Sequence, residues 1–148
     1  TACRAAYESG DAWLDELREH IAAAREHVAA RLAAVPGVEA APCEGTYLLW
    51  LDCTGLLAAT GLEADELDGF ILEEAGLWLD DGAIFGAGGR GFTRMNVACP
   101  RATLDEALDR LETGVTALLA RQGRRAHQAG RACTGAAAAA PAVVSTAA

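Results

Sequence analysis

Residues 92–101, FTRMNVACPR, are the most informative stretch of this 148-residue sequence. Their alternation predicts a strand, because successive side chains of a strand point to opposite faces. One face is mostly apolar and suits a core, whereas the other carries Arg94 and Asn96. An unpaired buried charge is costly, so Arg94 needs a structural Asp or Glu, a solvated edge, or an anionic ligand such as a carboxylate.

This strand and two further stretches carry a family resemblance. Residues 94–101, RMNVACPR, resemble the strand near the C-terminus of fold-type I pyridoxal-phosphate (PLP) enzymes, the aminotransferase class I/II superfamily. Residues 44–52, EGTYLLWLD, and 74–86, EAGLWLDDGAIFG, resemble segments of the cystathionine β-lyase type of cysteine-S-conjugate lyases. The three stretches come in the order and with the spacing of that family, and the resemblance extends over residues 1–121.

The resemblance implies the C-terminal, small domain of such an enzyme. Its fold would be α+β, an α/β sandwich in which helices pack on one face of a small, mostly antiparallel sheet. In the family, the arginine at the position of Arg94 binds the α-carboxylate of an amino-acid substrate. Asn96 would support Arg94 or contact the same region, and Tyr47 would lie near the substrate entrance, unless it is an ordinary sheet aromatic. The parent enzyme would be a homodimer.

The sequence contains no lysine, and all twelve of its basic residues are arginines. Enzymes of this type hold PLP as a Schiff base on a lysine amine. By resemblance, that lysine and the other PLP-binding residues lie in a preceding domain, which this chain would need as its partner. We therefore expect no catalytic, cofactor-binding or metal-binding residue here, and no PLP chemistry by the chain alone.

The parent reaction implied by the resemblance is β-elimination from a sulfur amino acid such as cystathionine. Transamination is the alternative within the family, because the same strand serves both reactions. Outside enzyme catalysis, the chain would be a stand-alone module that binds an amino acid or carboxylate through Arg94, or a truncation product without function. A binding module should lose its ligand on Arg94→Ala, whereas a truncated domain should expose an apolar patch.

Composition limits the other function classes. Twelve basic and twenty-one acidic residues give a net charge of −9, which disfavours nucleic acid or an anionic membrane as partner. The five cysteines are odd in number and irregularly spaced, which argues against a disulfide framework or a zinc site. This cysteine usage is typical of a reducing cytosol, so we expect a cytoplasmic protein. Separately, no stretch reaches the roughly 18–20 apolar residues that a membrane span needs.

The sequence divides into three parts. Residues 1–10 are expected to be a remnant of an upstream domain or a linker, residues 11–121 the aminotransferase-like C-terminal domain, and residues 122–148 a disordered tail rich in Ala, Gly and Arg. An apolar stripe that includes Trp13 and Leu14 predicts the first long helix. Expected helices cover residues 11–34, 64–75 and 103–121; expected strands cover 38–41, 46–53, 77–79 and 92–99, with a loop at 54–62.

Three further patterns look chemical but favour structural interpretations. His20 and His27 lack a third metal ligand and are expected to be solvated. Asp80 and Asp81 are expected to form a turn with Gly82 rather than a Mg²⁺ site. Residues 86–91, GAGGRG, match G-x-G-x-x-G, but a strand follows them where a dinucleotide site needs a helix, so they predict a flexible loop.

Overall fold

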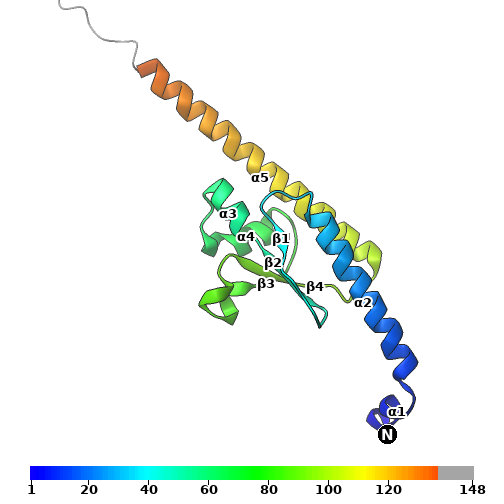
Figure 1. Ribbon diagram of the computed structural model, residues 1–148. Helices are drawn as coiled ribbons and strands as arrows, with labels where there is room; N and C mark the ends of the chain where they lie inside the picture. Colours follow the sequence, from blue (N-terminus) through cyan, green and yellow to red (C-terminus); the bar gives the residue numbers. More distant parts are fainter. Residues whose placement is uncertain (137–148) are drawn as a thin grey trace, which may run out of the picture.

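The structure is a computed structural model that describes residues 1–136 of the chain (Figure 1). Helices, short 3₁₀ turns (η) and strands follow one another in the order α1 (Ala2–Ser9), α2 (Asp11–Leu32), β1 (Glu39–Ala40), β2 (Leu48–Asp52), α3 (Thr54–Thr60), η1 (Ala64–Glu66), α4 (Leu67–Glu73), β3 (Asp80–Asp81), η2 (Gly82–Phe85), η3 (Ala87–Gly89), β4 (Phe92–Asn96) and α5 (Arg101–Ala136).

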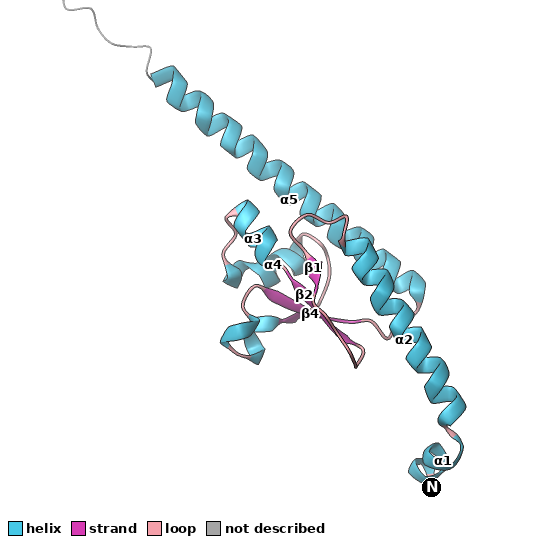
Figure 2. Cartoon of the chain, viewed as in Figure 1, coloured by secondary structure: helices cyan, strands magenta, loops and turns pink. Residues whose placement is uncertain are grey.

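The strands form one small antiparallel sheet with the order β1-β2-β4-β3 (Figure 2). β2 and β4 are the central strands, and their register places Trp50 opposite Arg94. On the other side of β4, Asp80 of β3 is also opposite Arg94. Trp50, Arg94 and Asp80 therefore form a row across three strands, on one face of the sheet.

The helices pack against the opposite face. Leu49, Leu51 and Met95 of the central strands are buried there, together with apolar residues of α2, α3, α4 and α5. α2 and α5 lie side by side along this layer (Figure 1). The expected α+β fold, with helices on one face of an antiparallel sheet, is confirmed. Among the described residues no α-helix covers the face that carries Arg94.

The apolar stripe of α2 is buried over only part of its length. Ala24, Val28 and Leu32 are in the core, but Trp13 and Leu14 are 67% and 38% exposed. The helix projects at its N-terminal end past the sheet and α5 (Figure 1). Periodicity predicted the helix correctly, but the apolar side chains of its first turns lie outside the core.

The expected loop at residues 54–62 is wrong, because α3 occupies most of it. The Asp52 carboxylate accepts hydrogen bonds from the amide and the hydroxyl of Thr54, at 2.9 and 2.6 Å, and so stabilises the start of this helix. Leu56 and Thr60 are buried against the core. A helix of seven residues with two buried side chains is too short for a periodic pattern to predict it.

The turn expected at Asp80 and Asp81 is also wrong. Both residues form β3 and pair with Arg94 and Thr93 of β4. Residues 77–79, expected to be the strand, precede this pairing without joining it, with Leu77 buried and Trp78 91% exposed. Pairing is decided by the partner strand, which lies further along the chain, and not by local composition.

The last helix differs from expectation at both ends. It begins at Arg101, since the Pro100 carbonyl accepts from the amides of Thr103 and Leu104. It continues to Ala136, so the disordered tail expected from residue 122 is wrong for residues 122–136. Alanine and arginine are strong helix formers, and they favour the helix although Gly123, Gly130 and Gly135 each oppose it by about 1 kcal/mol. Residues 137–148 lie outside the described part of the chain.

The described residues contain no helix that is both long and apolar enough to cross a membrane.

Candidate functional site

Arg94 lies at the centre of the open face of the sheet. It belongs to β4, between Trp50 on β2 and Asp80 on β3. Its neighbours along the strand, Thr93 and Met95, point into the core and are buried. The Arg94 side chain is only 25% exposed, so the guanidinium needs polar partners.

One edge of the guanidinium is held by Asp80. Nε and Nη2 of Arg94 both donate to the same carboxylate oxygen, Oδ2, at 3.0 and 2.7 Å. One face of the guanidinium is covered by Phe85, whose ring centroid lies 4.3 Å from Cζ. Charge-assisted hydrogen bonds and a cation over an aromatic ring both favour a fixed guanidinium. Of the three partners that the sequence allowed for Arg94, the structural carboxylate is therefore present.

The Asp80 pair still leaves part of Arg94 available. A guanidinium has five N–H donors, and Asp80 uses the edge formed by Nε and Nη2. Among the described residues none accepts a hydrogen bond from Nη1 of Arg94. The end of the fork, formed by Nη1 and the second N–H of Nη2, is a second edge that can bind a carboxylate with two parallel hydrogen bonds. The geometry thus accommodates a second anion beside Asp80.

Phe85 is positioned by the short turn η2. Asp81 stabilises the start of this turn by accepting from the amide of Ala83 at 3.0 Å. Gly82 lies so close to the backbone of Gly89 that a Cβ on it would be 2.2 Å from the Gly89 carbonyl oxygen. Only glycine fits this contact, which holds the segment over the open face of the sheet.

An aromatic hollow of about 310 Å³ lies next to the row of Trp50 and Arg94. Its aromatic lining consists of Trp50, Phe85 and Phe92, with the Trp50 ring edge-on to both phenyl rings at centroid distances of 5.4 and 6.5 Å. Such packing is favourable for aromatic rings. The hollow would accept apolar rather than charged groups.

The other two expected site residues lie at the far end of the sheet from this hollow. Asn96 is exposed, and its Oδ1 accepts from the amide of Ala98 at 2.9 Å, so it stabilises the turn that follows β4. Tyr47 precedes β2 and lines a separate hollow beside Arg18 and Arg25 of α2. Within the described residues no hydrogen bond joins Asn96 or Tyr47 to Arg94.

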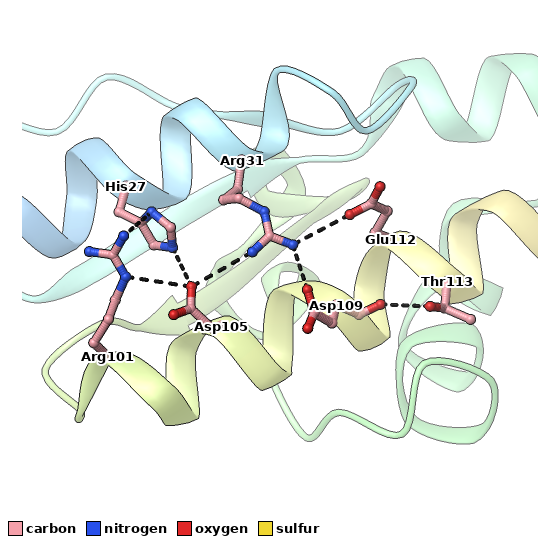
Figure 3. A network of polar contacts seen from close by, with 7 residues as sticks. All are labelled: His27, Arg31, Arg101, Asp105, Asp109, Glu112 and Thr113. Carbon is pink, nitrogen blue, oxygen red and sulfur yellow. Dashed lines mark hydrogen bonds and ion pairs between the residues drawn. The ribbon is translucent and has the colours of Figure 1, made fainter.

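A second polar cluster joins α2 to α5 (Figure 3). Nε2 of His27 donates to Oδ1 of Asp105 at 2.6 Å, and Arg101 donates to the other ring nitrogen, Nδ1. Since a guanidinium can only donate, Nδ1 accepts and Nε2 carries the proton. The His27 side chain is 16% exposed, so the expectation of a solvated histidine is wrong for His27.

The same cluster continues one turn along both helices. Nη2 of Arg31 donates to Oδ1 of Asp109 at 2.6 Å and to Oε2 of Glu112 at 3.4 Å, and Figure 3 shows the two halves side by side. The hydrogen bond from His27 lowers the pKa of Asp105, and the hydrogen bond to Asp109 raises the pKa of Arg31. Each charged side chain of this cluster contacts a polar side chain on the facing helix, which is typical of an interaction that holds two helices together.

Sequence reasoning missed Asp80 and Phe85. The sequence predicts a turn at Asp80, which hides its place opposite Arg94, and Phe85 has no signal beyond the family motif at residues 74–86. The one available signal was Arg94 itself, because an arginine on a half-buried strand requires an acidic partner. The nearest acidic residues that precede Arg94 in the sequence are Asp81 and Asp80.

Comparison with known proteins identifies sequence relatives of this chain. No protein-family model matches the chain. It is 36% identical to cystathionine β-lyase PatB of Bacillus subtilis over 117 residues, which are 78% of this chain and 29% of PatB. It is 32% identical to protein MalY of Escherichia coli, covering 80% of this chain and 30% of MalY. The chain therefore spans less than a third of the length of the curated relatives it matches.

Solved structures agree with the sequence relatives. Cystalysin from Treponema denticola, whose crystal structure contains pyridoxal 5′-phosphate, superposes with a TM-score of 0.71 at 32% identity. The match covers 79% of this chain and 29% of cystalysin. The chain is thus a homologue of one part of the fold-type I PLP-dependent enzymes of the aminotransferase superfamily. Within that superfamily, its curated relatives include cystathionine β-lyases, as the motifs at residues 44–52 and 74–86 implied.

Proposed function

We propose that this chain is the small-domain portion of a PLP-dependent carbon–sulfur β-lyase, and that Arg94 binds the α-carboxylate of its amino-acid substrate. The observation that carries the proposal is the state of Arg94. Its guanidinium is held on one edge by Asp80 and on one face by Phe85, while within the described residues its Nη1 end has no hydrogen-bond acceptor and no α-helix covers this face. A group fixed in this way is suited to a carboxylate.

The residues of this chain do not fit a covalent PLP site. The sequence has no lysine to form a Schiff base, and Arg94 has an acidic partner rather than a cluster of free donors for a phosphate. The cofactor of the parent enzyme would therefore be bound by a different segment, of the kind that makes up the remaining length of PatB. This chain would contribute substrate binding and orientation, not the chemistry of the cofactor.

Several features of the parent remain part of the proposal. Its substrate class would be sulfur amino acids such as cystathionine, in line with the names of the relatives. It would work as a homodimer in the cytoplasm, where thiols such as the free cysteines Cys3, Cys43, Cys53 and Cys99 stay reduced. Asn96 and Tyr47 would act at the substrate entrance rather than on the carboxylate.

The test uses the complete enzyme encoded by the reading frame that contains this chain. It should release pyruvate from L-cystathionine, and Arg94→Ala should lower kcat/KM by about 100-fold or more, because truncating one member of a charge pair costs at least 2–5 kcal/mol. Arg90→Ala is the matched control, since the exposed Arg90 pairs only with Asp65. Unchanged kcat/KM in Arg94→Ala, or the absence of pyruvate, would overturn the proposal.

Transamination is the second candidate. The chain is 27% identical to aspartate aminotransferase of Pyrococcus horikoshii, with 72% of this chain covered. In the same assay a transaminase would convert an amino acid to its oxo acid only when a second oxo acid is present. Pyruvate formation from L-cystathionine without an added oxo acid distinguishes the lyase.

A further inference from the structure

We propose that Asp80 is a positioning residue for Arg94: it fixes the guanidinium so that a ligand carboxylate binds at the Nη1 end. This inference rests on the proposed role of Arg94 as a carboxylate clamp. The alternative is that Asp80 competes with the ligand and must release Arg94 before binding. The geometry of the pair decides between these two roles.

Both hydrogen bonds of the pair use a single oxygen. Nε and Nη2 of Arg94 converge on Oδ2 of Asp80, at 3.0 and 2.7 Å. They occupy the side of the guanidinium, whereas a carboxylate that binds end-on needs Nη1 and the other N–H of Nη2. The two anions would therefore occupy different edges of Arg94, and the ligand would not have to displace Asp80.

The pairing of β3 with β4 fixes the backbone positions of Asp80 and Arg94. Asp80 and Arg94 are directly opposite each other in the β3–β4 ladder, so their Cα positions are set by the sheet. Phe85 then restricts rotation out of the plane by covering one face of the guanidinium, 4.3 Å from Cζ. A ligand that immobilises an arginine side chain normally has to offset the conformational freedom that the side chain loses. Here that ordering is already present before the ligand binds.

Asp80 also carries a negative charge, which opposes an incoming carboxylate. The Asp80 side chain is 47% exposed, so water screens this repulsion. This repulsion and the gain from positioning act in opposite directions on the affinity for a carboxylate. Replacing Asp80 with alanine alone would therefore change two opposed terms together, and a sharper comparison is needed.

Asp80→Asn and Asp80→Ala provide that comparison, because they have the same charge and differ in the acceptor. The single carbonyl oxygen of asparagine can accept both hydrogen bonds, since only Oδ2 of Asp80 is used. If Asp80 positions Arg94, the Asn variant should bind a carboxylate about tenfold more tightly than the Ala variant. If Asp80 competes with the ligand, both variants should bind equally, and both more tightly than the unsubstituted chain.

The measurement is a titration of the isotope-labelled chain with L-methionine, followed by NMR at the Arg94 Nε–Hε signal. L-Methionine amide, which lacks the carboxylate, is the ligand control. Asp65→Asn and Asp65→Ala form the matched pair of variants, because Asp65 binds Arg90 at 2.7 Å on the exposed surface. They should bind L-methionine as the unsubstituted chain does.

If Asp80 had a purely structural role, its replacement would change the stability of the fold. The folded Asn and Ala variants would then bind L-methionine with the same affinity. The positioning role also predicts that the Nε–Hε signal of Arg94, without ligand, stays close to that of the unsubstituted chain in Asp80→Asn and moves to the position of a free arginine in Asp80→Ala. Equal affinities in the two variants overturn the positioning role. If instead L-methionine and its amide perturb Arg94 alike in the unsubstituted chain, the carboxylate clamp itself fails.

Discussion

His27 donates from Nε2 to Oδ1 of Asp105 at 2.6 Å, and this hydrogen bond joins the two long helices that cover the sheet. Arg101 approaches the other nitrogen of the same ring, and Arg31 lies 3.6 Å from the same carboxylate oxygen. The side chains of His27, Arg31 and Arg101 therefore all lie close to the Asp105 carboxylate. The hydrogen bond from His27 is the main reason why the pKa of Asp105 lies below its ordinary value of 3.8.

Asp105→Asn should lower the midpoint of thermal unfolding at neutral pH. A carboxyl whose pKa is lowered in the folded state stabilises the fold when it is ionised. That stabilisation is complete above the unfolded-state pKa of 3.8 and is lost as the pH falls through the lower folded-state pKa. Urea unfolding of both proteins should therefore give a constant difference between pH 5 and 7, which narrows below about pH 4.

Glu106→Gln is the control for Asp105→Asn, because Glu106 is the next residue on α5 and pairs only with the exposed Arg110. Exposed pairs of this kind contribute little, so this variant should unfold like the unsubstituted protein. An Asp105→Asn difference that stays constant down to the lowest pH would contradict the assigned role of the ionised carboxylate.

Gly37→Ala should be strongly destabilising, whereas Gly61→Ala should cost much less. Both glycines have positive φ, +79° and +68°, and a side chain in this region costs about 1 kcal/mol. A Cβ on Gly37 would in addition lie 2.5 Å from the amide nitrogen of Leu56, while nothing lies within 4 Å of one on Gly61. We expect the free energy of unfolding to fall by about 3 kcal/mol or more in Gly37→Ala. Equal losses in the two variants would mean that backbone conformation, and not the close contact, sets the cost.

Cys53 should resist alkylation in the native state, whereas Cys3 should react. Cys53 is fully buried, and burial raises the pKa of its thiol to about 12. Because the thiolate is the nucleophile, almost no reactive form exists at pH 8. Cys3 lies on α1 and is exposed. Treatment with iodoacetamide followed by mass spectrometry should label Cys3 first and Cys53 only after urea is added. Labelling of both at one rate without urea would show that the core opens readily.

The sequence was sufficient for the parts of the fold that depend on local periodicity. The alternation in β4 predicted Met95 on the face towards the core and Arg94 on the other face, as the structure has them. A period of two fixes the faces of a strand without knowledge of its partners.

Features that depend on distant partners were not predictable in the same way. Asp80 has the composition of a turn and becomes a strand residue because β4 pairs with it. His27 has an ordinary surface pattern and becomes half-buried because α5 brings Arg101 and Asp105 to it. For the candidate site, resemblance supplied Arg94, but Asp80 and Phe85 required the register of the sheet and the path of η2.

The N-terminal turns of α2 lead to the last prediction. Trp13 and Leu14 belong to the apolar stripe of the helix, yet they are 67% and 38% exposed, and Tyr7 on α1 is 86% exposed. Large apolar side chains gathered in this way favour association with another surface. We expect the weight-average mass of the chain in sedimentation to rise with concentration, and Trp13→Ser to reduce this rise.

Trp13→Ser should leave the unfolding midpoint nearly unchanged, because an exposed side chain contributes within about 0.5 kcal/mol. Trp78→Ser is the matched control: Trp78 is 91% exposed but lies just before β3, away from α1 and α2 in the sequence. If the chain self-associates through the start of α2, only Trp13→Ser should reduce the rise of mass with concentration. An equal reduction in both variants would mean that any exposed tryptophan promotes association. A chain that stays monomeric at every concentration would exclude self-association through this surface.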